Sequence, residues 1–193
     1  MKNIAVFASG SGTNAEKIFE RFQQHPHVQV SLLLTNNPKA GVIVRAARYE
    51  VPVLVFDKSI FLHTDEVLEA LREAEVDLIV LAGFMLKVPD NILKAYPDRV
   101  VNIHPALLPN YGGKGMYGMH VHEAVVKARE KTSGISIHLC NENYDEGKII
   151  LQVSCALNSE DTAQDVAAKV QKLEHQYYPE VVEELAMQLN KHS

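Results

Sequence analysis

The 193-residue chain contains no tryptophan and only two cysteines, Cys140 and Cys155, which form no Cys-x-x-Cys pair. This scarcity argues against a disulfide-stapled secreted domain and against a cysteine zinc site. Two reduced, buried thiols are the simpler interpretation, and pairing across adjacent strands stays open. No apolar run approaches the ~18 residues that would span a bilayer. We therefore expect a cytoplasmic protein without a membrane partner.

The chain has fewer basic than acidic residues: 19 Lys and Arg against 24 Asp and Glu, which gives a formal net charge of -5. A nucleic-acid-binding face normally needs a net basic surface, so nucleic acid is not an expected partner. The length and the 47% hydrophobic content suit a single domain, residues 1–193, with a full core.

Short apolar runs alternate with amphipathic segments through the first half of the chain. Runs rich in Val, Ile and Leu without polar alternation suit strands that are buried on both faces of a parallel sheet. The alternation predicts right-handed βαβ units and an α/β fold with a doubly wound, mostly parallel sheet. The predicted strands are 3–8, 29–34, 53–56, 77–82 and 99–103, and the predicted helices are 14–24, 41–49, 64–74 and 89–96.

The second half predicts a β-hairpin and a long C-terminal helix. Thr162 and Asp165 have the spacing of a capping box that opens this helix. Pro179 is expected to break or restart it. Before it come a glycine-rich segment 112–118, a helix 119–129, and hairpin strands 134–140 and 148–155.

A glycine loop, Gly10-Ser-Gly-Thr-Asn-Ala15, lies between the first strand and the first helix. In this context backbone N–H groups and a helix N-terminus can hold phosphate. A dinucleotide site needs an acid at the end of the second strand, where this chain has Thr-Asn-Asn at 35–37. A simple phosphomonoester fits better, while a plain tight turn and an NADP site that uses Lys39 stay open.

Asn102 and His104 stand where the strand 99–103 ends, and Pro105 follows. Residues i and i+2 of a strand share a face, and proline keeps the preceding residue extended. An amide donor beside an imidazole can stabilise a developing oxyanion and move a proton. This pair indicates acyl or formyl transfer, although a capping Asn and a surface His are the plainer alternative.

The segment 102–109, together with Asp145, resembles the signature of folate-dependent formyltransferases, in which an Asn, a His and a distant Asp form the catalytic set. Segments 9–14, 81–85, 134–138, 145–147 and 171–175 resemble, in order, the phosphoribosylglycinamide formyltransferase family. This resemblance implies a Rossmann-like formyltransferase fold with a phosphate-binding half to about residue 100 and a catalytic and folate half beyond. It also implies that 10-formyltetrahydrofolate, as co-substrate, formylates the amine of 5-phosphoribosylglycinamide directly in purine biosynthesis.

The resemblance assigns a role to each matching residue, with no metal, and leaves a homodimer open. The catalytic residues are Asn102, His104 and Asp145, with Asp145 holding His104 protonated. The substrate phosphate is bound by Gly12, Thr13 and Asn14, and the substrate amine is received by Glu174. The folate is bound by Met85, Leu86, Lys87, Val88 and Asn102. The accessory residues are Ser136 and His138.

Three departures from the family pattern bear on these roles. Glu146 follows Asp145 where relatives usually have glycine, which leaves open which carboxylate faces the site; Asp145 is preferred from its register with His138. Leu86 stands where many relatives have an arginine. The family's arginine before the helix at 64 has no clear counterpart.

Other functions fit the sequence less well. A tRNA formyltransferase would add a C-terminal domain and a basic surface, and a formyltetrahydrofolate hydrolase would add an N-terminal regulatory domain. A non-enzymatic nucleotide-binding module would leave Asn102, His104 and Asp145 without a task. His120 and His122 invite a metal site, but residues i and i+2 do not share a helix face.

Overall fold

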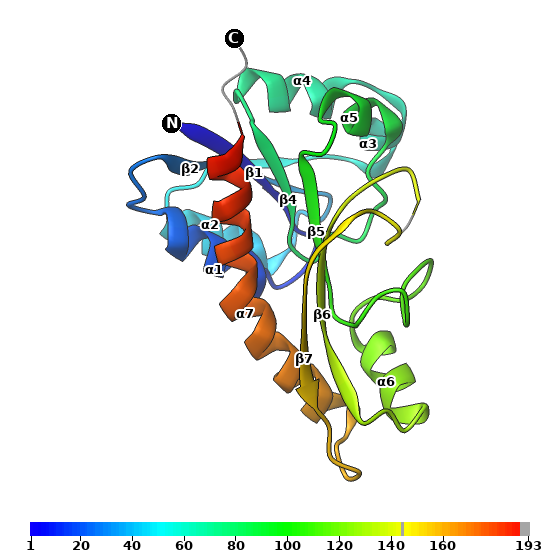
Figure 1. Ribbon diagram of the computed structural model, residues 1–193. Coiled ribbons are helices and arrows are strands. Elements are labelled where there is room, and N and C mark those ends of the chain that lie inside the picture. The colour runs from blue at the N-terminus through cyan, green and yellow to red at the C-terminus, as the bar shows by residue number, and fades with distance from the viewer. Residues whose placement is uncertain (144, 190–193) are drawn as a thin grey trace.

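A seven-stranded sheet of order β3-β2-β1-β4-β5-β6-β7 runs through the molecule (Figure 1). The computed structural model describes residues 1–143 and 145–189; Tyr144 and residues 190–193 of the expected domain lie outside this description. Strands β1 to β5 pair in parallel, and β6 and β7 add an antiparallel hairpin. The predicted doubly wound sheet is confirmed. The strands are β1 Lys2–Phe7, β2 Val28–Thr35, β3 Val53–Val55, β4 Leu78–Leu81, β5 Val100–His104, β6 Thr132–Leu139 and β7 Ile149–Ala156.

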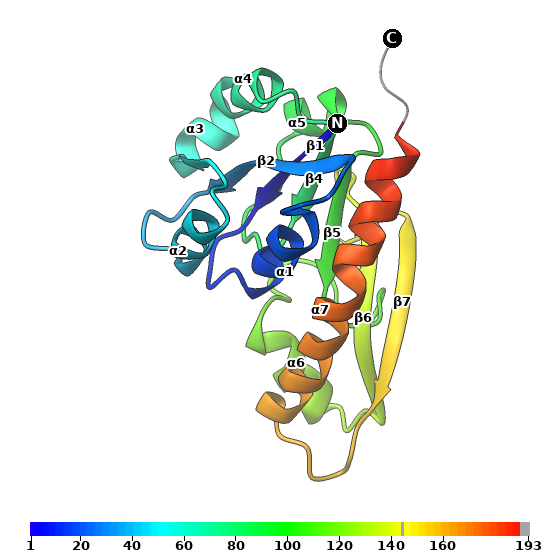
Figure 2. The ribbon, with the colours of Figure 1, turned by 90° about the vertical axis from the view of Figure 1, so that its left-hand side faces the viewer.

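The sheet has a core cluster on each face, and β1 shows how. Ile4 and Val6 belong to one core cluster, whereas Ala5 and Phe7 belong to the other. This is the alternation of side chains expected of a strand. Helices α1 (Thr13–Phe22), α2 (Gly41–Arg48), α6 (Met119–Lys127) and α7 (Ala163–Gln188) supply the first cluster; α3 (Lys58–His63), α4 (Glu66–Glu73) and α5 (Asp90–Ala95) supply the second (Figure 2).

Helix α7 is continuous over 26 residues, so the expected break at Pro179 is wrong. Proline removes one intrahelical hydrogen bond, but Pro179 is buried together with Tyr178, Val181 and Val182. This tertiary packing holds the helix through the proline. The predicted capping box is confirmed, since the side chains and backbone N–H groups of Thr162 and Asp165 bond reciprocally.

Two further differences from the sequence-based expectations are local. Helix α3 was not predicted; Asp57 caps it by accepting a hydrogen bond from the Ser59 backbone N–H at 2.6 Å. The two cysteines are free thiols, because Cys155 pairs with Ser133 along the hairpin while Cys140 lies beyond the other end of β6. Within the described residues, no helix is long and apolar enough to cross a membrane.

Candidate active site

A cavity of about 430 Å³ opens beyond the carboxyl ends of β4 and β5 and reaches Asn14 at the start of α1. Strand order reverses between β1 and β4, and ligands of open α/β sheets bind at such a switch point. The cavity brings together ten of the thirteen residues to which the sequence assigns roles. They are Asn14, Met85, Leu86, Lys87, Val88, Asn102, His104, His138, Asp145 and Glu174.

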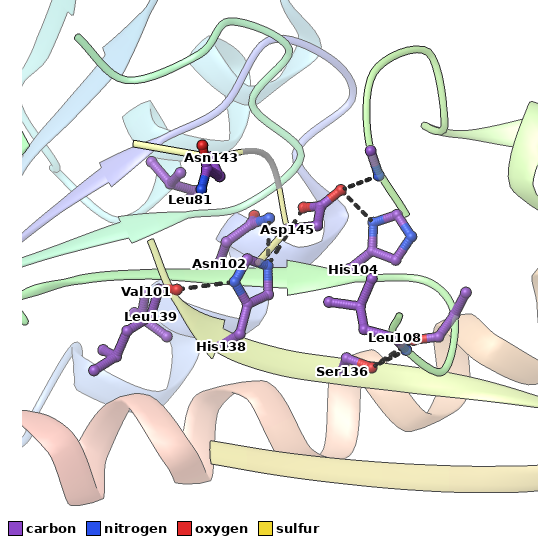
Figure 3. Close-up of polar contacts among 12 residues, drawn as sticks. Leu81, Val101, Asn102, His104, Leu108, Ser136, His138, Leu139, Asn143 and Asp145 are labelled. Atoms are coloured by element: carbon purple, nitrogen blue, oxygen red, sulfur yellow. Dashed lines mark hydrogen bonds and ion pairs between the residues drawn. The ribbon is translucent and has the colours of Figure 1, made fainter. Parts of the chain in front are cut away.

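Asp145 stands between two imidazoles in the loop that follows β6 (Figure 3). Its Oδ2 lies 3.7 Å from His104 Nδ1 and accepts a 2.9 Å hydrogen bond from the Gly113 backbone N–H, while its Oδ1 lies 3.5 Å from His138 Nε2. Burial raises the pKa of Asp145, but His138, the Gly113 N–H and His104 outweigh it and hold that pKa below its usual value. Asp145 is therefore a carboxylate at neutral pH. Glu146 is exposed and does not line the cavity.

His104 is buried, with its side chain 5% exposed, at the end of β5. Its Nε2 lies 2.7 Å from the Tyr111 carbonyl, which can only accept, so Nε2 carries a hydrogen. In the neutral ring Nδ1 is then unprotonated and faces Asp145. Burial lowers the pKa of His104 by more than Asp145 and the Tyr111 carbonyl raise it. The pKa of His104 thus lies below its usual value in the protein without ligand, contrary to the expectation that Asp145 keeps this imidazole charged.

Asn102 is held by His138 on the neighbouring antiparallel strand, with which it is in register. Asn102 Nδ2 lies 3.2 Å from His138 Nε2, and His138 Nδ1 lies 3.0 Å from the Leu139 carbonyl. A carboxamide has two N–H donors. Asn102 lines the cavity, so a carboxamide N–H can reach a ligand oxygen there.

The glycine loop is packed against the start of α2. Gly12 has φ of +78°, and a Cβ there would lie 2.4 Å from Val42 Cγ2. From α2, Arg45 Nε also donates to the Ser11 carbonyl at 2.8 Å. Only glycine fits this close, left-handed turn at the start of α1, where the first helical N–H groups have no intrahelical partner.

Helix α7 lies beside the start of α1 and adds two side chains there. Gln171 Nε2 donates to Thr13 Oγ1 at 3.3 Å, and Asn14 Nδ2 donates to Glu174 Oε2 at 3.0 Å. Burial raises the pKa of Glu174, although Asn14 lowers it in part. Asn14 Oδ1 is buried without a hydrogen-bond partner. The two helices thus form a polar end wall of the cavity.

Ser136 does not line the cavity and is fully buried. Its hydroxyl donates to the Ala106 carbonyl at 2.7 Å and accepts from the Leu108 N–H at 2.9 Å. Ser136 therefore holds the turn that follows His104, and a direct contact with a small molecule in the cavity is excluded by this burial.

Several residues of the site were not predicted from the sequence. Tyr111 and Gly113 act through backbone atoms, which leave no signal in a side-chain pattern. His122 lines the cavity with a buried, unpartnered Nδ1, whereas His120 is exposed beside Glu123. Burial first, and the nearby His104 second, lower the pKa of His122. Among the described residues no group of three His, Cys, Asp or Glu side chains could hold a metal ion.

The fold and the cavity define an α/β protein of the ligand-binding, switch-point class, with groups that can stabilise an oxyanion and move a proton. Comparison with known proteins is more specific. Residues 2–182 match the family described as formyl transferase. The chain belongs to the formyl transferase family.

Two similar proteins are named phosphoribosylglycinamide formyltransferase. The chain is 41% identical to the chloroplastic phosphoribosylglycinamide formyltransferase of Arabidopsis thaliana, over 94% of this chain and 64% of that protein. It is 36% identical to the Bacillus subtilis phosphoribosylglycinamide formyltransferase, over 96% and 95% of the two chains. It thus spans less than two thirds of the plant relative but nearly all of the bacterial one.

Solved structures agree with this likeness. The phosphoribosylglycinamide formyltransferase of Bacillus halodurans superposes with a TM-score of 0.86 at 38% identity, over 97% of this chain and 96% of that one. The corresponding enzyme of Anaplasma phagocytophilum gives a TM-score of 0.89 at 32% identity, over 97% and 87%.

Proposed function

We propose that the protein transfers the formyl group of 10-formyltetrahydrofolate to the amine of 5-phosphoribosylglycinamide in purine biosynthesis. The observation that carries this proposal is the convergence of Asn102, His104 and Asp145 on one cavity that also reaches the glycine loop. The names of the relatives support the same reaction. The chain is proposed to act as one functional domain, since a single sheet spans the phosphate-binding and catalytic halves.

In the proposed reaction the amine of the substrate attacks the formyl carbon and forms the new C–N bond. A carboxamide N–H of Asn102 donates to the formyl oxygen as negative charge develops there. His104 Nδ1 takes the proton that the amine loses, and Asp145 stabilises the imidazolium. The proton then passes to N10 of the folate as the C–N10 bond breaks and tetrahydrofolate leaves.

Each substrate is proposed to occupy one arm of the cavity. Backbone N–H groups of Gly12, Thr13 and Asn14 hold the phosphate at the start of α1, and Glu174 receives the amine-bearing end. The folate lies along Met85, Leu86, Lys87 and Val88, which also line the cavity. No metal takes part in this proposal.

The protein is proposed to work in the cytoplasm, where its two free cysteines stay reduced. Two plant relatives are named as chloroplastic. A homodimer is compatible with the reaction, although the single chain already brings together the residues proposed to act.

The experiment is a difference-absorbance assay with 10-formyltetrahydrofolate and 5-phosphoribosylglycinamide, each alone and both together. Tetrahydrofolate should form only when both are present. Formation of tetrahydrofolate from the folate alone would indicate a hydrolase instead. A protein that binds the phosphate compound but converts nothing would be a nucleotide-binding module.

A further inference from the structure

Ser9 joins the two loops that the proposed reaction must bring together. It follows β1 and opens the segment that leads to the phosphate-binding residues Gly12 to Asn14. Its backbone N–H donates to the Gly83 carbonyl at 3.1 Å, and its Oγ accepts from the Met85 backbone N–H at 3.0 Å. One residue at the root of the glycine loop therefore makes two hydrogen bonds to the loop after β4.

The hydroxyl of Ser9 is oriented by a third partner. Ser9 Oγ donates to Asn36 Oδ1, at the end of β2, over 2.7 Å. A serine hydroxyl has a single hydrogen, so this bond leaves the lone pairs of Oγ for the Met85 N–H. Asn37 Nδ2 also donates to the Ser9 carbonyl at 3.3 Å. Ser9 is thus fixed from the carboxyl ends of two parallel strands.

The loop that Ser9 holds needs such a support. Gly83 has φ of +75°, and the space around its α-carbon is open. Met85, two residues on, is 52% exposed, so little packing fixes its side chain. Phe84, Leu86 and Val88 pack against the core cluster that contains Phe7, whereas the exposed Met85 between them is held through its backbone N–H by Ser9.

We propose that Ser9, oriented by Asn36, is a positioning residue that sets the folate-binding loop 83–88 relative to the phosphate-binding loop 9–14. The inference rests on the proposed function, because each loop then carries one of the two reacting molecules. The distance between the attacking amine and the formyl carbon follows from the distance between the loops. A misplacement of about 1 Å can reduce a rate by about 10²-fold.

Replacing Ser9 tests this role through kinetics. Ser9→Ala keeps the backbone bond to Gly83 but removes both side-chain bonds. We expect kcat to fall by roughly 10- to 100-fold and the KM for the folate to rise. The KM for the phosphorylated substrate should change less than about twofold, because the N–H groups of the phosphate loop are untouched. Ser9→Thr retains the hydroxyl and should recover most of kcat.

Asn36→Ala should show a weaker effect in the same direction. The double variant should match Ser9→Ala alone, since Asn36 acts through Ser9 and the two losses are then not additive. Additive losses, an equal rise of both KM values, or no recovery in Ser9→Thr would each overturn the proposal in favour of a general loss of structure.

Amide hydrogen exchange at Met85 gives a readout that needs neither substrate. Exchange should be faster in Ser9→Ala than in the wild type and should return toward the wild-type rate in Ser9→Thr, since it reports local opening. Unchanged exchange in Ser9→Ala would overturn the inference about the loop. A wild-type protein without formyl transfer would instead refute the proposed function, and the exchange result would still decide the role of Ser9.

Discussion

At the scale of single residues, the protonation of His104 is set by a competition between burial and Asp145. Burial disfavours the imidazolium, and the carboxylate 3.7 Å away favours it. Burial dominates and lowers the pKa, so the ring is neutral at neutral pH in the protein without ligand. A neutral ring can take a proton from the attacking amine, and the nearby carboxylate then favours the charged product.

The pH dependence of kcat/KM follows from this assignment. Activity should be lost as the pH falls through the pKa of His104, which lies below the ordinary 6.5. Asp145→Asn removes an interaction that raises this pKa, so the acid limb should move to still lower pH. The plateau should fall by at least about tenfold because the imidazolium is less stabilised.

The matched control is Glu146→Gln, the exposed neighbour of Asp145, whose profile should coincide with the wild type. Both variants and the wild type are compared as kcat/KM between pH 5 and 9. An activity that disappears instead on the alkaline side, above 6.5, would mean that His104 works in its charged form.

Asn102→Ala tests the oxyanion donor. The variant should keep the fold and lose about 10²–10³ in kcat, the usual range for one such donor. Substrate KM values should change far less, because the bond strengthens as charge develops. Asn141→Ala, at the rim of the same cavity, is the control and should stay near wild type. Near-normal turnover in Asn102→Ala would remove this residue from the mechanism.

Asn102, His104 and Asp145 could be proposed from the sequence because their chemistry depends on side-chain type and on a recognisable pattern. The environment of these three side chains could not be predicted from the sequence. The fall in the pKa of His104 comes from burial under the loop after Pro109, and its tautomer comes from the Tyr111 carbonyl. Ser136 was expected in the site from the resemblance of segment 134–138, yet its hydroxyl bonds to the turn after His104 instead.

At the scale of elements, the strands of the parallel sheet were predictable because each is a short, continuous apolar run. Helix α3 has only six residues, too few for a clear helical period, and it lacks the proline that marks the start of the equally short α5. At Pro179 the sequence predicts a helix break, but the structure has none. Local propensity favours the break, and burial of the surrounding residues overrides it. Local sequence signals failed where tertiary packing decides.

The turn between β1 and α1 gives a prediction at this scale. Gly12→Ala would place a Cβ 2.4 Å from Val42 in a left-handed conformation. We expect a loss of about 1–3 kcal/mol in the free energy of unfolding and a rise of roughly tenfold in the KM for the phosphorylated substrate. The KM for the folate should be nearly unchanged. Thermal unfolding and initial-rate kinetics measure these effects.

Gly10→Ala is the matched control for this turn, because a Cβ there would meet nothing within 4 Å. It should unfold within about 0.5 kcal/mol of the wild type and keep its KM values. Equal effects of the two substitutions would show that the loop is sensitive to any side chain, and that the close approach of Gly12 to Val42 has no special role.

At the scale of the whole molecule, the site depends on segments far apart in sequence that meet at the carboxyl edge of one sheet. The loops after β1, β4 and β5, the loop after β6 and one face of α7 each contribute (Figure 1). The cavity is lined both by Asn14 of the phosphate-binding segment and by residues of the loop 83–88. This arrangement suits two substrates that react with each other in its centre.

The central claim is direct transfer between these two substrates, and the fate of a ¹³C-labelled formyl group tests it most directly. The wild-type protein is mixed with labelled 10-formyltetrahydrofolate and 5-phosphoribosylglycinamide, and the products are followed by NMR. We predict that the label appears in the formamide of the phosphorylated product, in a one-to-one ratio with tetrahydrofolate. Label released as free formate, or retained on the folate, would contradict the account.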